Sequence, residues 1–265
     1  MRSVIDEALA LIYDQMPNLH EIKVSKVCVG LGYTGVKLST GHVGLCHSLL
    51  GEWVPRCCQV VKHAGTLAGS PAIDLANLAK SWDTSESVVG VATLNALSQS
   101  VLNRKKYLIA EGNFMDYMEQ KVEESDIVAL VGYIEPFVEI LRRKARHLYV
   151  FERNSTLFDE QILPDTACEE FLPQADVIII TGSSIANKTI DHVLELSQGT
   201  KEIGVVGPSA SLIPDPLFKR GVTIIGSIKV VNPDRLLQII AEGGGTPQIK
   251  SAVKFINIRA KPITI

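Results

Sequence analysis

The chain has 265 residues, and 26 Lys and Arg against 29 Asp and Glu leave a formal net charge of −3. The composition, with 46% hydrophobic and 21% charged residues, is ordinary for a globular protein and excludes a disordered, collagen-like or low-complexity chain. The weakly acidic balance argues against nucleic acid as a partner. No apolar run approaches the roughly 18 residues that a membrane helix needs, so we expect no membrane partner.

The N-terminus turns acidic within residues 1–7, which is unlike a secretion signal. The five cysteines are an odd number, and without such a signal they indicate reduced thiols. We therefore expect a cytoplasmic protein.

The first hundred residues are predicted to form an α+β domain, 1–103. An amphipathic helix over 3–16 has Ser3 and Asp6 as a capping box. Three short β-type runs form a meander, and two helices follow it. The meander strands are expected at 24–31, 35–39 and 42–47, with turns at 33–34 and 40–41, and the helices at 70–80 (Ser70 as cap) and 85–103.

The remainder, 104–265, alternates strands and helices in a different manner. Short runs rich in Val and Ile are typical of parallel strands buried on both faces. These runs cover 127–131, 148–151, 177–181, 203–206 and 222–225, and helical segments lie at 135–144, 187–196, 214–219 and 233–242. The pattern predicts a Rossmann-like, doubly wound and mostly parallel sheet, so the fold class is α/β, with an α+β domain preceding the sheet.

A Gly-x-Gly-x-x-Gly motif at 30–35 matches the dinucleotide fingerprint in letters only. The fingerprint requires a helix to begin at its third glycine, whereas a strand-like run follows Gly35. We interpret the motif as a β-hairpin, which argues against NAD as the cofactor.

Residues 24–79 are poor in charge and hold four of the five cysteines and three of the six histidines. On a strand, His42 and Cys46 would share a face but lie about 13 Å apart, too far for a preformed zinc site. The adjacent Cys57 and Cys58 are also a poor pair for one ion. Cysteines buried as small apolar side chains are one interpretation, and a more open metal site using His42 and Cys46 is the other.

Polar residues and glycines gather where the strands of the second domain end. Open α/β sheets bind ligands at this edge, so these residues are predicted to form a ligand site, although Asn187 or Thr189 could instead only cap a helix. The candidates are Gly132, Tyr133, Glu152, Thr181, Gly182, Ser183, Asn187, Thr189, Gly207, Pro208 and Ser209. Asn95 lies in a helix that is apolar nearly all round, so it either bonds to backbone or faces the cleft between the domains.

These residues also carry a resemblance. The runs 132–136, 175–189 and 207–214, with Glu152 between them, resemble the family named for putative heavy-metal chelation, and the helix around 92–96 is similar to that family's N-terminal domain. The resemblance implies an enolase-N-terminal-like domain on a Rossmann-like domain, with the site between them. It also implies the handling of a heavy metal or of a metal-chelating small molecule.

Three functions therefore follow as hypotheses. The first is a protein that binds a divalent heavy metal or a metal-chelating ligand in the cleft. The second is an enzyme that uses a nucleotide-type ligand, for instance an adenosyl group, because Glu152 lies where a ribose-binding acid sits in nucleotide-binding halves. The third is a non-catalytic scaffold that forms a homo-oligomer through residues 24–79.

Overall fold

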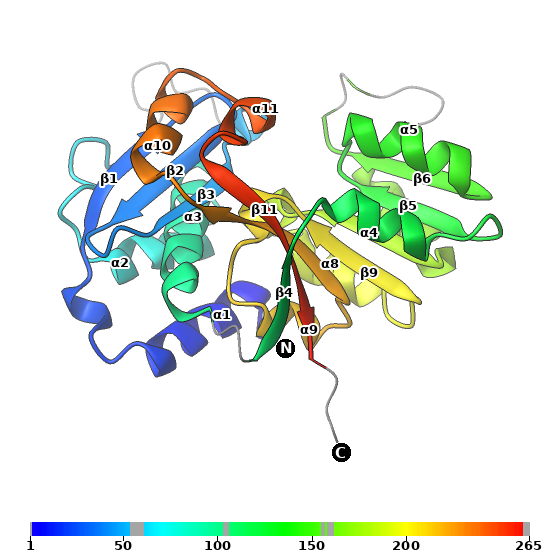
Figure 1. The fold of residues 1–265 in the computed structure, drawn as a ribbon, viewed down its shortest axis with the longest axis horizontal. Coiled ribbons are helices and arrows are strands. Elements are labelled where there is room, and N and C mark those ends of the chain that lie inside the picture. The colour runs from blue at the N-terminus through cyan, green and yellow to red at the C-terminus, as the bar shows by residue number, and fades with distance from the viewer. Residues whose placement is uncertain (1, 54–60, 103–105, 155–156, 158–161, 262–265) are drawn as a thin grey trace.

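The computed structural model describes residues 2–53, 61–102, 106–154, 157 and 162–261 (Figure 1). The α-helices described are α1 (Val4–Gln15), α2 (Ala72–Asn77), α3 (Thr84–Val101), α4 (Phe114–Lys121), α5 (Glu135–Lys144), α6 (Cys168–Phe171), α7 (Ser183–Ala186), α8 (Ile190–Leu196), α9 (Asp215–Phe218), α10 (Pro233–Ala241) and α11 (Thr246–Ile249). The strands are β1 (Val24–Val29), β2 (Tyr33–Leu38), β3 (Val43–His47), β4 (Tyr107–Glu111), β5 (Ile127–Val131), β6 (His147–Glu152), β7 (Ile162–Pro164), β8 (Val177–Thr181), β9 (Glu202–Val206), β10 (Ile224–Val230) and β11 (Val253–Ala260). Short 3-10 helices are η1 (Leu19–Glu21), η2 (Leu50–Glu52), η3 (Leu78–Lys80), η5 (Asp165–Ala167), η6 (Leu172–Gln174) and η7 (Pro208–Ala210).

The helices α1 and α3 each begin after a polar N-cap residue. Ser3 accepts a hydrogen bond from the Asp6 amide at 3.1 Å and donates to the Asp6 carboxylate at 2.8 Å, so the predicted start of α1 is confirmed. Asp83 caps α3 by accepting from the Ser85 amide, so this helix begins at Thr84, one residue before the predicted start. Ser70 makes no cap for α2, which begins after Pro71.

The meander predicted at 24–47 is confirmed as the antiparallel sheet β1-β2-β3. Its first turn lies at 30–32 and not at 33–34, because Tyr33 and Thr34 already pair within β2. The glycine motif therefore forms a hairpin and no helix follows it, as its sequence context predicted.

Both faces of the meander are covered, which explains its low charge density. Gly44 of β3 lies against α3, where an added Cβ would come within 2.2 Å of the Ala92 carbonyl oxygen and the Ala96 nitrogen. On the other face Gly35 lies against Leu237 and Ile240 of α10. Figure 1 shows the three strands between these two helices, so the C-terminal half of the chain completes the layer that the N-terminal half begins.

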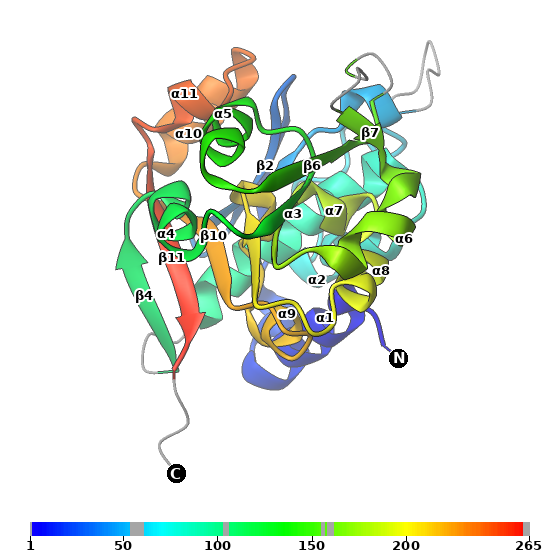
Figure 2. The ribbon, with the colours of Figure 1, turned by 90° about the vertical axis from the view of Figure 1, so that its right-hand side faces the viewer.

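The larger sheet has eight strands in the order β4-β11-β10-β9-β8-β5-β6-β7. Its six parallel strands, taken in chain order, follow the 3-2-1-4-5-6 order of doubly wound dinucleotide-binding folds, so the predicted α/β class is confirmed. The strands β4, β7 and β11 lie outside the strands predicted from the sequence. Figure 2 shows β4 and β11 side by side at one edge, where they pair antiparallel.

Alternate residues of the central strands enter two different cores. Val128 and Leu130 of β5 pack with α4 and α5, whereas Ala129 and Val131 belong to the core that also contains α1, α3 and α8. This second core is continuous from the N-terminal helices to the large sheet. The predicted domain boundary, between 103 and 104, lies outside the described residues.

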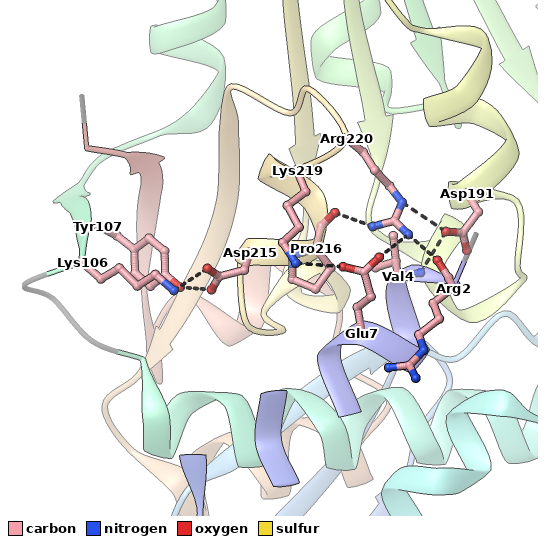
Figure 3. A network of polar contacts seen from close by, with 10 residues as sticks. All are labelled: Arg2, Val4, Glu7, Lys106, Tyr107, Asp191, Asp215, Pro216, Lys219 and Arg220. Atoms are coloured by element: carbon pink, nitrogen blue, oxygen red, sulfur yellow. Dashed lines mark hydrogen bonds and ion pairs between the residues drawn. The ribbon is translucent and has the colours of Figure 1, made fainter. Parts of the chain in front are cut away.

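Charged contacts around α9 attach the N-terminal helix to the second half (Figure 3). The Arg220 guanidinium contacts the Glu7 carboxylate at 2.9 Å and that of Asp191 at 3.6 Å. At the start of α9, Asp215 accepts hydrogen bonds from Lys106 and Tyr107 of the β4 region. Within the described ranges, no helix is both long and apolar enough to cross a membrane.

Candidate functional site

A cleft of about 1400 Å³ runs along the edge of the large sheet where its parallel strands end. The floor is made by the residues that follow β5, β8 and β9, and Tyr33, His47 and Glu52 of the N-terminal segment line it as well. The point between β5 and β8, where the strand order reverses, is where doubly wound sheets bind ligands. Ligand pockets commonly measure about 300–1,000 Å³, so this cleft has room for an organic molecule.

The turn after β5 is closed by a glycine and a carboxylate. Gly132 has φ +94°, and an added Cβ would lie 2.4 Å from the Thr181 methyl group, so only glycine fits between these strands. Glu152, at the end of β6, accepts hydrogen bonds from the Tyr133 amide at 2.8 Å and from the Arg153 amide at 2.7 Å. The Glu152 carboxylate thus accepts the hydrogen bond of a backbone amide that would bind a phosphate in a dinucleotide-binding turn.

The turn after β8 is a cluster of short polar side chains. The hydroxyls of Thr181 and Ser183 lie 3.1 Å apart, and both residues line the cleft. The Asn187 side-chain oxygen accepts from the Thr189 hydroxyl at 2.9 Å, while its amide donates to Glu52 at 3.4 Å. Asn187 therefore connects this turn to the N-terminal segment.

The turn after β9 is attached to the meander. The Ser209 hydroxyl oxygen accepts a hydrogen bond from the His47 amide at 2.9 Å. Gly207 (φ +122°), Pro208 and Ser209 all line the cleft, as does Gly182 beside them. Of the twelve ligand-site candidates, this cleft brings together all except Asn95.

Asn95 lies behind the wall of the cleft. It is fully buried, and its amide donates to the carbonyls of Leu45 at 2.8 Å and Ser209 at 2.9 Å, while its side-chain oxygen has no partner in the described structure. Of the two alternatives for Asn95, hydrogen bonding to backbone is therefore the one found. These bonds hold β3 to the turn that contains Ser209.

The two metal candidates lie apart from the cleft lining. His42 precedes β3 at the end opposite to His47 and is hydrogen-bonded to the Thr40 hydroxyl at 3.0 Å. Cys46 is fully buried, and burial raises the pKa of its thiol to about 12, although a hydrogen bond with Ser209 acts in the other direction. Among the residues that the structure describes, no three His, Cys, Asp or Glu side chains are grouped to hold a metal ion. Cys57 and Cys58 lie outside the described residues.

Of the described residues, two histidines line the cleft, His47 and His192, and His47 is the neighbour of the buried Cys46. Its ring is exposed to the cleft and meets the Tyr33 ring edge to face, with 6.0 Å between centroids. The protein around it reduces hydration, which lowers the pKa of the imidazole, and the Glu152 carboxylate opposes that shift. Alternation along a strand predicts that Cys46 and His47 face opposite ways, but the sequence does not say which face is open.

Acidic side chains outnumber basic ones on the described lining. The acids are Glu52, Glu111, Glu135, Glu152, Asp165 and Glu169, six in all, and the bases are Arg153, Lys250 and Lys254, three in all. At the rim, Arg153 lies 3.6 Å from Glu52 and 3.2 Å from Asp165, so it bridges the N-terminal segment and the large sheet. The potential of such a cleft favours a cationic ligand.

One end of the cleft is lined by residues that were not predicted from the sequence. Lys254 of β11 pairs with Glu111 of β4 at 3.0 Å, and the Tyr33 and Thr246 hydroxyls lie 2.7 Å apart. Glu111 and Lys254 belong to β4 and β11, the last two strands at one side of the sheet, and Thr246 belongs to the short helix α11; none of these three elements has a clear sequence signature. Because the antiparallel β11 begins where β10 ends, its first residues join the edge that the parallel strands form.

The fold and the cleft define a class: a doubly wound α/β protein with a ligand-sized cleft at its strand ends, partly walled by an antiparallel meander. Two family models, both described as putative heavy-metal chelation, match residues 13–98 and 114–259. The chain belongs to this family, and the resemblance found in the sequence is confirmed.

Similar proteins extend this finding without adding an activity. An uncharacterized protein of Methanocaldococcus jannaschii is 34% identical over 182 residues, which cover 67% of this chain and 68% of that protein. A DUF364-family protein of unknown function from Pyrococcus horikoshii matches in structure with a TM-score of 0.82 and 25% identity, covering 97% of this chain and 100% of the other. Another, from Desulfitobacterium hafniense, has a TM-score of 0.79 and 23% identity over 96% and 98% of the two chains, and shows the fold alone.

Proposed function

We propose that this protein binds a metal cation carried by a small organic chelator in the cleft at the strand ends. The observation that carries the proposal is the excess of acidic over basic side chains, six against three, around a cavity of about 1400 Å³. The volume suits an organic molecule, and the charge suits a cation. The family name, which refers to heavy-metal chelation, agrees with both.

Most acidic side chains of the lining already have partners. Glu52 and Asp165 contact Arg153, Glu111 contacts Lys254, and the Glu152 carboxylate accepts backbone amides. They would therefore supply a negative field rather than a complete set of metal ligands. A chelator that brings most of its own donor atoms fits this arrangement.

A nucleotide-type ligand is the second candidate, and the strand order of the parallel sheet favours it. Glu152 occupies the Tyr133 amide, where a phosphate would otherwise bind, and the acidic lining repels phosphates. An adenosyl group without a phosphate is the form that this turn would accept.

A thermal-shift panel tests the proposal and separates the two candidates. Divalent cations alone, their complexes with small carboxylate chelators, and nucleotides would each be added to the full chain. Binding to the native state raises the unfolding free energy, by about 2.7 kcal/mol at 100 times Kd. We expect the melting midpoint to rise with metal chelates and not with nucleoside phosphates.

The variant Ser183→Trp tests whether binding takes place in the cleft. Ser183 is half-buried on the cleft lining, so a large ring there would fill the cleft. We expect this variant to lose the rise in midpoint. An equal rise in wild type and variant would mean binding elsewhere, and no rise with any metal or chelate would contradict the proposal.

The domain boundary between 103 and 104 and the cytoplasmic location are also part of what we propose. The free thiols of Cys28, Cys46 and Cys168 support the cytoplasmic location.

A further inference from the structure

The imidazole of His47 is a donor group on the cleft wall without a described partner. It belongs to β3, its ring is exposed to the cleft, and within the described structure no hydrogen bond or ion pair engages its ring nitrogens. Three carboxylates of the cleft lining differ in this respect, because Glu52, Glu111 and Glu152 each have a cationic or amide partner.

The position of His47 is fixed from three sides. Its backbone amide donates to the Ser209 hydroxyl oxygen at 2.9 Å, and its ring packs edge to face on Tyr33, with an interplanar angle of 86°. Behind it, Asn95 joins Leu45 to the backbone of Ser209. A donor held in this way loses little conformational freedom when it binds a ligand.

We propose that His47 coordinates the metal of the chelate through a neutral ring nitrogen, at a coordination position that the chelator leaves open. This inference rests on the proposed function and names the protein's own donor. Imidazole suits copper, nickel, zinc and iron, and it must be neutral to bind them. Desolvation in the cleft favours the neutral ring, and the Glu152 carboxylate nearby balances part of the cation's charge.

The test uses copper(II) iminodiacetate, a chelate with an open position that takes imidazole. Histidine ring signals would be followed by NMR in the full chain while the chelate is added below equimolar amounts. We expect the His47 signals to broaden first, and electron paramagnetic resonance to show nitrogen coupling from one imidazole. Substituting a residue that only hydrogen-bonds to a metal ligand lowers metal affinity about 10–100-fold. Removal of the proposed ligand itself, in His47→Gln, should therefore lower the affinity of the tightest site for the chelate at least about tenfold.

His192→Gln is the matched control, since His192 is also exposed on the cleft lining but contacts Glu169 at 2.5 Å. This control should leave the tightest site unchanged, and both variants should keep the wild-type melting midpoint without chelate.

The outcomes separate this inference from the proposed function. If the amides of Gly132, Gly182 and Gly207 respond to the chelate equally in wild type and His47→Gln, the cleft binds it without His47, and only the inference is overturned. If the chelate engages other histidines and leaves these glycines unchanged, the inference is also overturned, and the thermal-shift panel decides the proposed function. Broadening of the His47 signals in wild type, together with loss of the glycine responses in His47→Gln, supports the inference.

Discussion

The meander makes two kinds of contact with the rest of the molecule. On its faces, β2 and β3 are packed against α3 and α10 so closely that glycines are required, and the contacts are buried. At its end, His47 and the segment after it meet the large sheet through hydrogen bonds and partly exposed ion pairs. Close packing therefore fixes where the meander lies, whereas the polar contacts determine what the cleft presents to a ligand.

The close-packed side of this comparison is tested most strongly at Gly44. In Gly44→Ala the new Cβ would lie 2.2 Å from two backbone atoms of α3, so the helix or the strand must move. We expect the free energy of unfolding to fall by about 3 kcal/mol, measured by urea denaturation. Gly51→Ala, where no atom lies within 4 Å, is the control; equal losses would show that the contact with α3 is loose.

The buried link between the two kinds of contact is tested at Asn95. Asn95→Ala removes the donor to the Leu45 and Ser209 carbonyls, and we expect a loss of about 2 kcal/mol in urea denaturation. Gln99→Ala, farther along α3, removes a longer hydrogen bond, 3.4 Å from the Gln99 amide to the Ser211 carbonyl, so it should lower the free energy of unfolding by less. A larger effect at Gln99 would contradict the role assigned to Asn95.

The contact of α9 with the β4 region should depend on pH (Figure 3). Burial acts to raise the pKa of Asp215, but hydrogen bonds from Lys106 and Tyr107 outweigh it and lower the pKa below its usual value. A lowered pKa in the folded state stabilises the protein above the pKa of the unfolded chain, and this stabilisation is lost as pH falls through the folded value.

We expect Asp215→Asn to lower the free energy of unfolding by about 1.5 kcal/mol at pH 7 and by less below pH 4. Urea denaturation across this pH range measures the difference. A gap between wild type and variant that stays constant down to pH 2 would refute the assignment.

The polar side of the comparison is tested at Ser209. Ser209→Ala removes the acceptor for the His47 amide and should cost about 1 kcal/mol. Hydrogen exchange of the His47 amide should become faster, whereas Ser183→Ala, which loses only the contact with Thr181, should leave that exchange unchanged. An unchanged exchange rate in Ser209→Ala would show that the bond does not hold β3.

The smallest effect is expected at Arg153. Its ion pairs with Glu52 and Asp165 are partly exposed, so Arg153→Ala should cost less than about 1 kcal/mol, and high salt should reduce the difference. Urea denaturation at two salt concentrations measures both quantities. A loss that is larger and independent of salt would place these contacts among the buried ones.

Local patterns predicted the parallel sheet and the meander because their signals lie within short segments. Continuous Val and Ile runs such as that of β8 indicate strands buried on both faces, and the residues after them make up most of the cleft. β4 escaped notice because it is an edge strand whose partner, β11, lies far along the chain, and β11 because it has polar residues between its buried ones, unlike the continuous apolar runs of the parallel strands. That His47 lines the cleft could not be predicted, because which face of β3 is open depends on α3 and α10.

The packing of α10 on the meander also bears on how the chain folds during synthesis. The Cys28 thiol contacts the carbonyl oxygen of Leu237, which lies 209 positions later in the chain. One face of the meander is therefore uncovered until most of the chain has left the ribosome. Contacts of such long separation form late, and the apolar surface they bury, around Tyr33 and Leu45, is open to association in the meantime. A nascent chain of this protein is thus expected to need protection at this surface until α10 emerges.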